Sequence, residues 1–401
     1  PDGTPAEYSP DNIPLSPRHH LPVSLEGIRE DDFAMILGYP GSTDRYLTSH
    51  GIEYQLEHMY PVRIDIRRAK LDILDEAMHK DHAVRIMYAS KHASIANYWK
   101  NFIGMSEALK KHRVADTKRE LEAEFIDWIA SEPERQQAYA EVMSNFEKAY
   151  AGLSQFHSHN IVFAETVASG PDIMSLANNF SSLLQILEEN GSDESVENEV
   201  GRLRGSAVRT YKDYDKHVDQ RMWAAMFEKY YQLNPSCMQA PLFYEIVNVF
   251  SGNFDVYAEY VYANSIFASK ETLDEFFSSP DAVTLKEDPV FTAATALYDH
   301  NRTINRQMSP YNAQKNEADR LFQKGLLEMK PEQLFYPDAN STMRFTYGKV
   351  KGYYPADAVY YHYKTTLHGV MEKENPDHHE FVVPRRLSEL YETKDFGVYA
   401  E

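Results

Sequence analysis

The pattern of apolar and polar positions changes twice along the chain. Near the start, an unbroken apolar run, Phe33 to Leu37, lies between Asp31-Asp32 and the turn residues Gly38-Tyr39-Pro40-Gly41. A short apolar run between turn residues is typical of a strand buried on both faces. Residues 1–45 are therefore predicted to form a β segment.

From about residue 46 the apolar positions recur with a helical period. Leu121, Phe125, Trp128 and Ile129 lie at i, i+4, i+7 and i+8, which makes one apolar face of an amphipathic helix. The same spacing predicts helices over 139–150, 172–190, 208–231 and 241–268, and the acidic stretch 188–199 is predicted to be a solvated loop. Residues 46–338 are thus predicted to be an α-helical domain.

The pattern reverts to β after Pro337. Arg344 to Val350 alternates polar and apolar residues, and Ala358 to Tyr363 is rich in strand formers, with one short helix expected near 386–393. Residues 339–401 are predicted to form a returning β segment. The fold class is therefore mainly α, with a helical domain inserted into one β module. Because insertion points lie close together, the strands near Phe33 and Arg344 are predicted to be neighbours.

Charge excludes two classes of partner. The 401 residues include 61 acidic and 41 basic side chains, a formal net charge of −20. This excess repels phosphate groups, so neither nucleic acid nor an anionic membrane is an expected partner.

No apolar stretch is long enough to span a bilayer. The single cysteine, Cys237, is expected to be a small core residue, and the chain ends suggest a piece of a longer protein.

The sequence contains no obvious catalytic nucleophile. It lacks a Gly-x-Ser-x-Gly elbow, and no catalytic residue is predicted within the chain. Glu76 and His79 share one helical face, but a di-iron site needs a second such motif. His157 and His159 form another short pair, although such pairs are usually solvated. No metal or cofactor is predicted, and a metal enzyme built on Glu76 and His79 remains a weaker alternative.

A stripe of small polar residues is the most distinctive local feature. Ser90, Ser94, Asn97 and Asn101 are spaced 4, 3 and 4 residues apart, so they share one side of a helix. Two interpretations are open: the stripe faces water or other helices, or it presents amide and hydroxyl groups to a polar ligand.

Several motifs together resemble the bacterial dipeptidyl-peptidase 7 and dipeptidyl-peptidase 11 family. They are Gly38-Tyr39-Pro40-Gly41-Ser42-Thr43-Asp44-Arg45-Tyr46-Leu47-Thr48-Ser49, Tyr88-Ala89-Ser90-Lys91, Ala96-Asn97-Tyr98-Trp99-Lys100-Asn101, Met343-Arg344-Phe345-Thr346-Tyr347-Gly348 and Gly369-Val370-Met371-Glu372-Lys373-Glu374. The resemblance implies a serine exopeptidase of the periplasm or cell surface of a Gram-negative bacterium. Such enzymes have a chymotrypsin-like double β-barrel with an inserted helical cap, release dipeptides from free N-termini and are homodimers.

The same resemblance assigns roles to individual residues. It implies that the catalytic His and Asp precede this chain and that the catalytic Ser follows it, so the chain alone is expected to be inactive. Asn97 matches the asparagine that binds the α-amino group of the peptide substrate. Ser94 and Asn101, which share its polar stripe, are candidate supporting residues. The main alternative, from a different functional class, is a helical binding or scaffold protein without catalytic activity.

Overall fold

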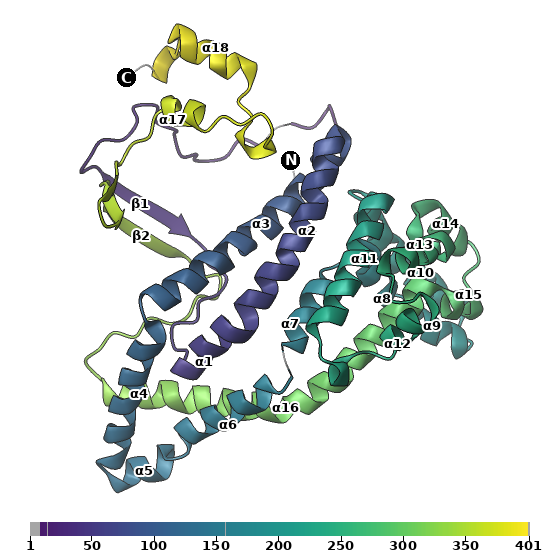
Figure 1. The fold of residues 1–401 in the computed structure, drawn as a ribbon, viewed down its shortest axis with the longest axis horizontal. Helices are drawn as coiled ribbons and strands as arrows, with labels where there is room; N and C mark the ends of the chain where they lie inside the picture. The colour runs from purple at the N-terminus through teal and green to yellow at the C-terminus, as the bar shows by residue number, and fades with distance from the viewer. Residues whose placement is uncertain (1–8, 14, 157, 400–401) are drawn as a thin grey trace. The chain divides into compact units, whose positions relative to one another are not determined.

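The computed structural model describes residues 9–13, 15–156 and 158–399 (Figure 1). The chain divides into two compact units. Asp44–Pro337 forms the helical unit, and Pro1–Thr43 with Asp338–Glu401 form the mixed unit. The fold is mainly helical, as the sequence predicts. No helix among the described residues combines the length and apolar character needed to cross a bilayer.

The helical unit is built from α-helices and short 3₁₀ or π turns. In chain order its elements are α1 Ser49–Tyr54, η1 Gln55–Met59, α2 Tyr60–Lys80, α3 His82–Lys111, α4 Val114–Ala130, α5 Pro133–Tyr139, α6 Val142–Ser154, α7 His159–Phe163, η2 Ala164–Ala168, α8 Asp172–Asn178, α9 Ser181–Glu188, α10 Asp193–Tyr211, α11 Lys216–Leu233, η3 Ser236–Met238, α12 Leu242–Val249, α13 Phe254–Asn264, η4 Ile266–Ala268, α14 Lys270–Phe276, α15 Ala282–Glu287 and α16 Pro289–Met329.

The longest helix, α16, runs along the helical unit (Figure 1). It contributes side chains to three apolar clusters of this unit. It begins with the Asp288 side chain accepting the backbone N–H groups of Val290 and Phe291 and with proline at the first helical position. Its first turns contribute to the main core, and its last turns pack with α4, α5 and α6. The helix continues through Pro310.

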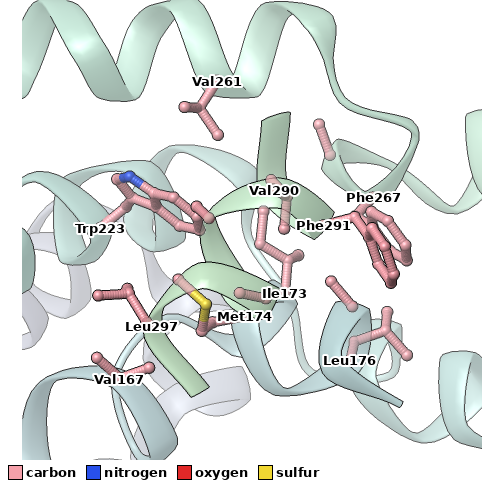
Figure 2. Close-up of a cluster of buried hydrophobic side chains, with 14 of the residues drawn as sticks. Val167, Ile173, Met174, Leu176, Trp223, Val261, Phe267, Val290, Phe291 and Leu297 are labelled. Carbon is pink, nitrogen blue, oxygen red and sulfur yellow. The ribbon is translucent and has the colours of Figure 1, made fainter. Parts of the chain in front are cut away.

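The main core lies where α8, α11, α13 and the start of α16 meet. Figure 2 shows Trp223 of α11 and Ile173 of α8 among the side chains of Val290 and Leu297 from α16. All four side chains are fully buried, and each removes apolar surface from water. A second cluster joins α2, α3 and α11 and supports the hairpin described below.

The mixed unit contains two small antiparallel ribbons and short helices. Its elements are β1 Phe33–Gly38, β2 Arg344–Lys349, β3 Tyr353–Ala356, β4 Val359–Tyr361, α17 Leu367–Glu372, η5 His379–Phe381, α18 Arg385–Thr393 and η6 Gly397–Tyr399. β1 pairs with β2, and β3 pairs with β4.

The predicted pairing of the two distant strands is confirmed. β1 and β2 run antiparallel, with Phe33 opposite Lys349 and Gly38 opposite Arg344. The predicted burial of β1 on both faces is wrong for this chain, because Phe33 is 69% and Ile36 70% exposed. Among the described residues, β1 pairs only with β2. The side chains of Phe33 and Ile36 are therefore left largely uncovered.

Hydrogen bonds join the two chain segments at which the chain leaves the mixed unit and returns to it. The Thr43 hydroxyl donates to Asp338 Oδ1 at 2.6 Å, and the Ala339 N–H donates back to Thr43 Oγ1 at 2.9 Å. The Ser341 N–H also donates to the Pro40 carbonyl at 2.9 Å. Residues almost 300 positions apart are therefore neighbours, as expected at the neck of an insertion.

Several finer predictions fail. The helices predicted over 172–190, 208–231 and 241–268 are each interrupted. α8 ends at Asn178 before α9 begins at Ser181, α10 ends at Tyr211 before α11 begins at Lys216, and α12 ends at Val249 before α13 begins at Phe254. Part of the predicted acidic loop is helical, since α10 begins at Asp193 with Ser192 as its cap. Cys237 is exposed rather than buried, because it lies in the short turn between α11 and α12.

Candidate functional site

The predicted polar stripe lies on α3, the second helix of a hairpin with α2. A single residue, Asp81, separates the two helices and caps α3, with its Oδ1 accepting the N–H groups of Ala83 at 2.7 Å and Val84 at 3.4 Å. The two helices pack closely against each other (Figure 1). The hairpin thus holds α3 along one side only.

The inner side of α3 is apolar and buried. Val84 and Tyr88 pack with Ile66 and Leu74 of α2 and with Met222 of α11. The Tyr88 hydroxyl also accepts the backbone N–H of Asp215 at 3.0 Å, and burial raises the pKa of this hydroxyl well above its usual value. These contacts define which side of α3 faces the rest of the helical unit.

The polar stripe occupies the other side of the same helix. Ser94, Asn97 and Asn101 are all exposed, and so is Ser90. Since successive residues are about 100° apart, Asn97 lies roughly 140° around the helix from the buried Phe102. Within the described ranges, no hydrogen bond to another side chain engages Ser94, Asn97 or Asn101. The structure therefore brings these three residues together on an open surface, and they take no part in core packing.

A buried ionic cluster that sequence reasoning missed lies on the α2 side of the hairpin. Glu165 of η2, 4% exposed, accepts hydrogen bonds from Arg67 Nε at 3.1 Å and Nη2 at 2.9 Å. Lys70, 2% exposed, lies 3.5 Å from the same carboxylate and donates to the Ser169 carbonyl at 2.8 Å. Burial lowers the pKa of Lys70 to about 8, although Glu165 opposes this shift.

A second ionic contact attaches α3 to α8. Lys91 Nζ lies 2.7 and 2.8 Å from the two oxygens of Asp172. The Asp172 backbone N–H in turn donates to the buried carboxylate of Asp219 at 2.6 Å. Burial, together with the charge of Asp172, raises the pKa of Asp219. The turn of α3 between Ser90 and Ser94 is therefore tied to the main core.

The residues of the predicted metal alternative have other partners. The Glu76 carboxylate pairs with Lys80 at 2.5 Å and with Arg221, while His79 is exposed. His157 lies outside the described residues, and His159 is buried. Among the residues that the structure describes, no group of three or more His, Cys, Asp or Glu side chains is arranged to hold a metal ion.

A cavity of about 360 Å³ lies elsewhere in the helical unit. Its lining includes Tyr54, Tyr150, His159 and Lys315 but not Asn97, Ser94 or Asn101. The predicted substrate residues are therefore on a surface and not in this cavity.

Comparison with known proteins agrees with the resemblance seen in the motifs. The chain matches the family described as Peptidase S46 over residues 1–401. It is 36% identical to dipeptidyl-peptidase 7 of Phocaeicola vulgatus over 100% of this chain and 55% of that protein. It is 34% identical to the Asp/Glu-specific dipeptidyl-peptidase of Flavobacterium psychrophilum over 99% of this chain and 55% of that one.

A solved structure shares the fold. The crystal structure of Porphyromonas endodontalis DPP11 in complex with the dipeptide Arg-Glu has a TM-score of 0.83 and 30% sequence identity to this chain. The match covers 99% of this chain and 56% of that one. The chain therefore spans about half the length of the relatives that it matches.

Proposed function

Because the chain belongs to the peptidase S46 family, we propose that it is the helical cap region, with adjoining β segments, of a serine-type dipeptidyl-peptidase. The complete enzyme would release dipeptides from peptides that have a free N-terminus. Related proteins carry the names dipeptidyl-peptidase 7 and Asp/Glu-specific dipeptidyl-peptidase, which supports this reaction class. The reaction proposed here requires no cofactor.

One observation carries the proposal for the site. Asn97 is exposed on the side of α3 that does not pack into the helical unit, between Ser94 and Asn101 on the same side. An exposed row of amide and hydroxyl groups on an ordered helix can bind a polar ligand without disturbing the core. We propose that Asn97 binds the α-amino group of the substrate and that Ser94 and Asn101 support it.

The chemistry of an asparagine suits this role. Its side-chain carbonyl oxygen accepts a hydrogen bond from an ammonium group. A residue that holds the N-terminus at a fixed distance from the nucleophile makes the enzyme cut after the second residue, because position determines which bond is attacked. A carboxylate from outside this chain would balance the ammonium charge, since neutral dipoles alone do not compensate its desolvation.

The rest of the enzyme is also part of the proposal. The catalytic His, Asp and Ser are proposed to lie outside residues 1–401, and the chain by itself is expected to be inactive. The exposed apolar residues of β1 and β2 suit a ribbon that continues into a chymotrypsin-like barrel, because two-stranded ribbons alone are barely stable. We also propose a periplasmic or cell-surface location and a homodimer.

Substitution of Asn97 in the full-length enzyme tests the proposed site. Asn97→Ala removes a hydrogen bond to a charged group, worth about 1.5 to 3 kcal/mol. We expect kcat/KM for a dipeptidyl reporter with a free amine to fall roughly 10- to 100-fold. The slow cleavage of the same reporter with an acetylated amine should barely change, because that substrate never makes the contact.

Ser90→Ala provides the matched control. Ser90 is exposed on the same side of α3, nearly two helical turns before Asn97, and is not proposed to contact the substrate. Both variants should melt within a degree or two of the wild type, because exposed side chains contribute little to stability. Equal losses on free and acetylated reporters would remove Asn97 from the substrate site.

A further inference from the structure

Two consecutive arginines of α2 stack on two consecutive aromatic residues of α3. The guanidinium of Arg67 lies 5.2 Å from the ring centre of Tyr98, and that of Arg68 lies 5.1 Å from the ring centre of Trp99. Both distances fall within the range of a cation–π contact. Tyr98 and Trp99 directly follow Asn97 in the sequence.

Carboxylates hold both guanidinium groups in place. Glu165 accepts two hydrogen bonds from Arg67 and is itself buried. Arg68 donates to Asp72 at 2.8 Å and to Asp75 at 2.9 Å. The planar guanidinium can bind a carboxylate with its edge and an aromatic ring with its face at the same time, which lysine cannot do. Each guanidinium group is therefore held by carboxylates as well as by the aromatic ring on which it stacks.

The two stacks restrict rotation of α3 about its own axis. Tyr98 and Trp99 point about 100° apart around the helix, on the two flanks of the side that packs on α2. A rotation in either direction would pull one ring away from its arginine. Phe102 reinforces the Arg67 flank, because the same guanidinium lies 5.5 Å from its ring centre. Tyr98 and Trp99 lie within one helical turn of Asn97, so these two stacks determine the direction in which the Asn97 side chain points.

We propose that Arg67, held by Glu165, is a positioning residue for substrate binding: it fixes the rotation of α3 through Tyr98 and so directs Asn97 toward the substrate amine. This proposal rests on the proposed function of Asn97. Glu165 belongs to η2, which packs against α2. Through Glu165, the rest of the helical unit therefore helps to fix the position of Arg67. Arg67 itself does not touch the substrate.

The test uses Arg67→Lys in the full-length enzyme. Lysine keeps the positive charge beside Glu165 but loses the planar stack on Tyr98. We expect kcat/KM for a free-amine dipeptidyl reporter to fall roughly tenfold, because small errors in substrate position are costly. The acetylated reporter should lose less than twofold. Tyr98→Leu should reproduce the selective loss, and Tyr98→Phe, which keeps the ring, should not.

Arg135→Lys is the matched control. Arg135 stacks on Trp128 at 4.6 Å and pairs with Glu132 at 2.9 Å, so it has the same chemistry on helices other than α3. Arg135→Lys should leave kcat/KM unchanged for both reporters, even if its melting temperature falls as much as that of Arg67→Lys. A selective loss in Arg135→Lys would mean that general loosening of the unit is responsible, and would overturn the proposal.

A double variant separates this proposal from the proposed function. If Arg67 acts through Asn97, Arg67→Lys should cost little in an Asn97→Ala background, so the double variant should be within about twofold of Asn97→Ala alone. Multiplicative losses would overturn the positioning role and leave Asn97 as the amine ligand. If Asn97→Ala alone loses no selectivity for free amines, the proposed function of Asn97 fails and the positioning role fails with it.

Discussion

The hydroxyl group of Tyr262 donates a hydrogen bond to the carboxylate of Asp219 across 2.7 Å, and both side chains are almost fully buried. The same carboxylate accepts the backbone N–H groups of Asp172 at 2.6 Å and Ile173 at 3.4 Å. A single carboxylate on α11 thereby joins α13 to the first turn of α8. Because Lys91 of α3 pairs with Asp172, this junction also supports the hairpin that carries Asn97.

Removing the Tyr262 hydroxyl should therefore destabilise the helical unit. Tyr262→Phe leaves the buried Asp219 carboxylate with one donor fewer, at a cost of roughly 1 to 3 kcal/mol in the free energy of unfolding. Tyr230→Phe is the control, because the buried Tyr230 hydroxyl has no hydrogen-bond partner among the described residues. Urea denaturation should show a loss for Tyr262→Phe only, and an equal loss in both variants would contradict the role of the Asp219 junction.

His159 should make the chain sensitive to acid. Its side chain is fully buried, Nδ1 lies 3.0 Å from Asn234 Oδ1, and the ring of His300 lies 5.6 Å away. Burial lowers the pKa of His159 to about 4. The ordinary pKa of histidine is near 6.5, so between about pH 6.5 and pH 4 His159 binds a proton in the unfolded chain but not in the folded chain. The folded state should thus lose stability as pH falls, by on the order of 3 kcal/mol.

A titration of stability isolates this effect. His159→Gln replaces the imidazole with a group that does not titrate, so its stability should depend less on pH between 7 and 4. The difference in urea midpoint between wild type and variant should shrink as the pH falls. His79→Gln changes an exposed histidine and should follow the wild-type curve. A constant difference between His159→Gln and wild type would show that His159 does not cause the acid sensitivity.

The sequence predicts the order of the secondary-structure elements well where each element has a recognisable local pattern of apolar and polar residues. Phe33–Leu37 and Arg344–Val350 have strand patterns of their own, and the helical pattern between them implies an insertion that brings them together. Both strands and their pairing are found. The break between α10 and α11 is less visible, because apolar residues continue on both sides of it. Its cause is Asp215, whose side chain caps α11 by accepting the N–H groups of His217 and Val218.

The positions of the polar groups could not be predicted in the same way. The spacing of Arg67 and Lys70 on α2 is visible in the sequence, but their shared partner Glu165 comes almost 100 residues later, in a π turn. Helical periodicity says which side of a helix a residue occupies and not which distant residue it meets. The stripe around Asn97 was recognisable for the opposite reason, since all its members lie on one helix.

Two glycines in helices should respond oppositely to alanine. At Gly325 of α16, a Cβ atom would lie 2.5 Å from Cε2 and 2.7 Å from Cζ of the fully buried Phe125. Phe125 also packs on Phe322, so the ring has little room to move, and Gly325→Ala should cost about 1 to 3 kcal/mol. At Gly104 of α3, nothing lies within 4 Å of the added atom, so Gly104→Ala should stabilise the helix by about 0.5 to 1 kcal/mol. Thermal melts of the two variants should move in opposite directions. Destabilisation by Gly104→Ala would show that this side of α3 packs against something, contrary to the open surface on which the role of Asn97 depends.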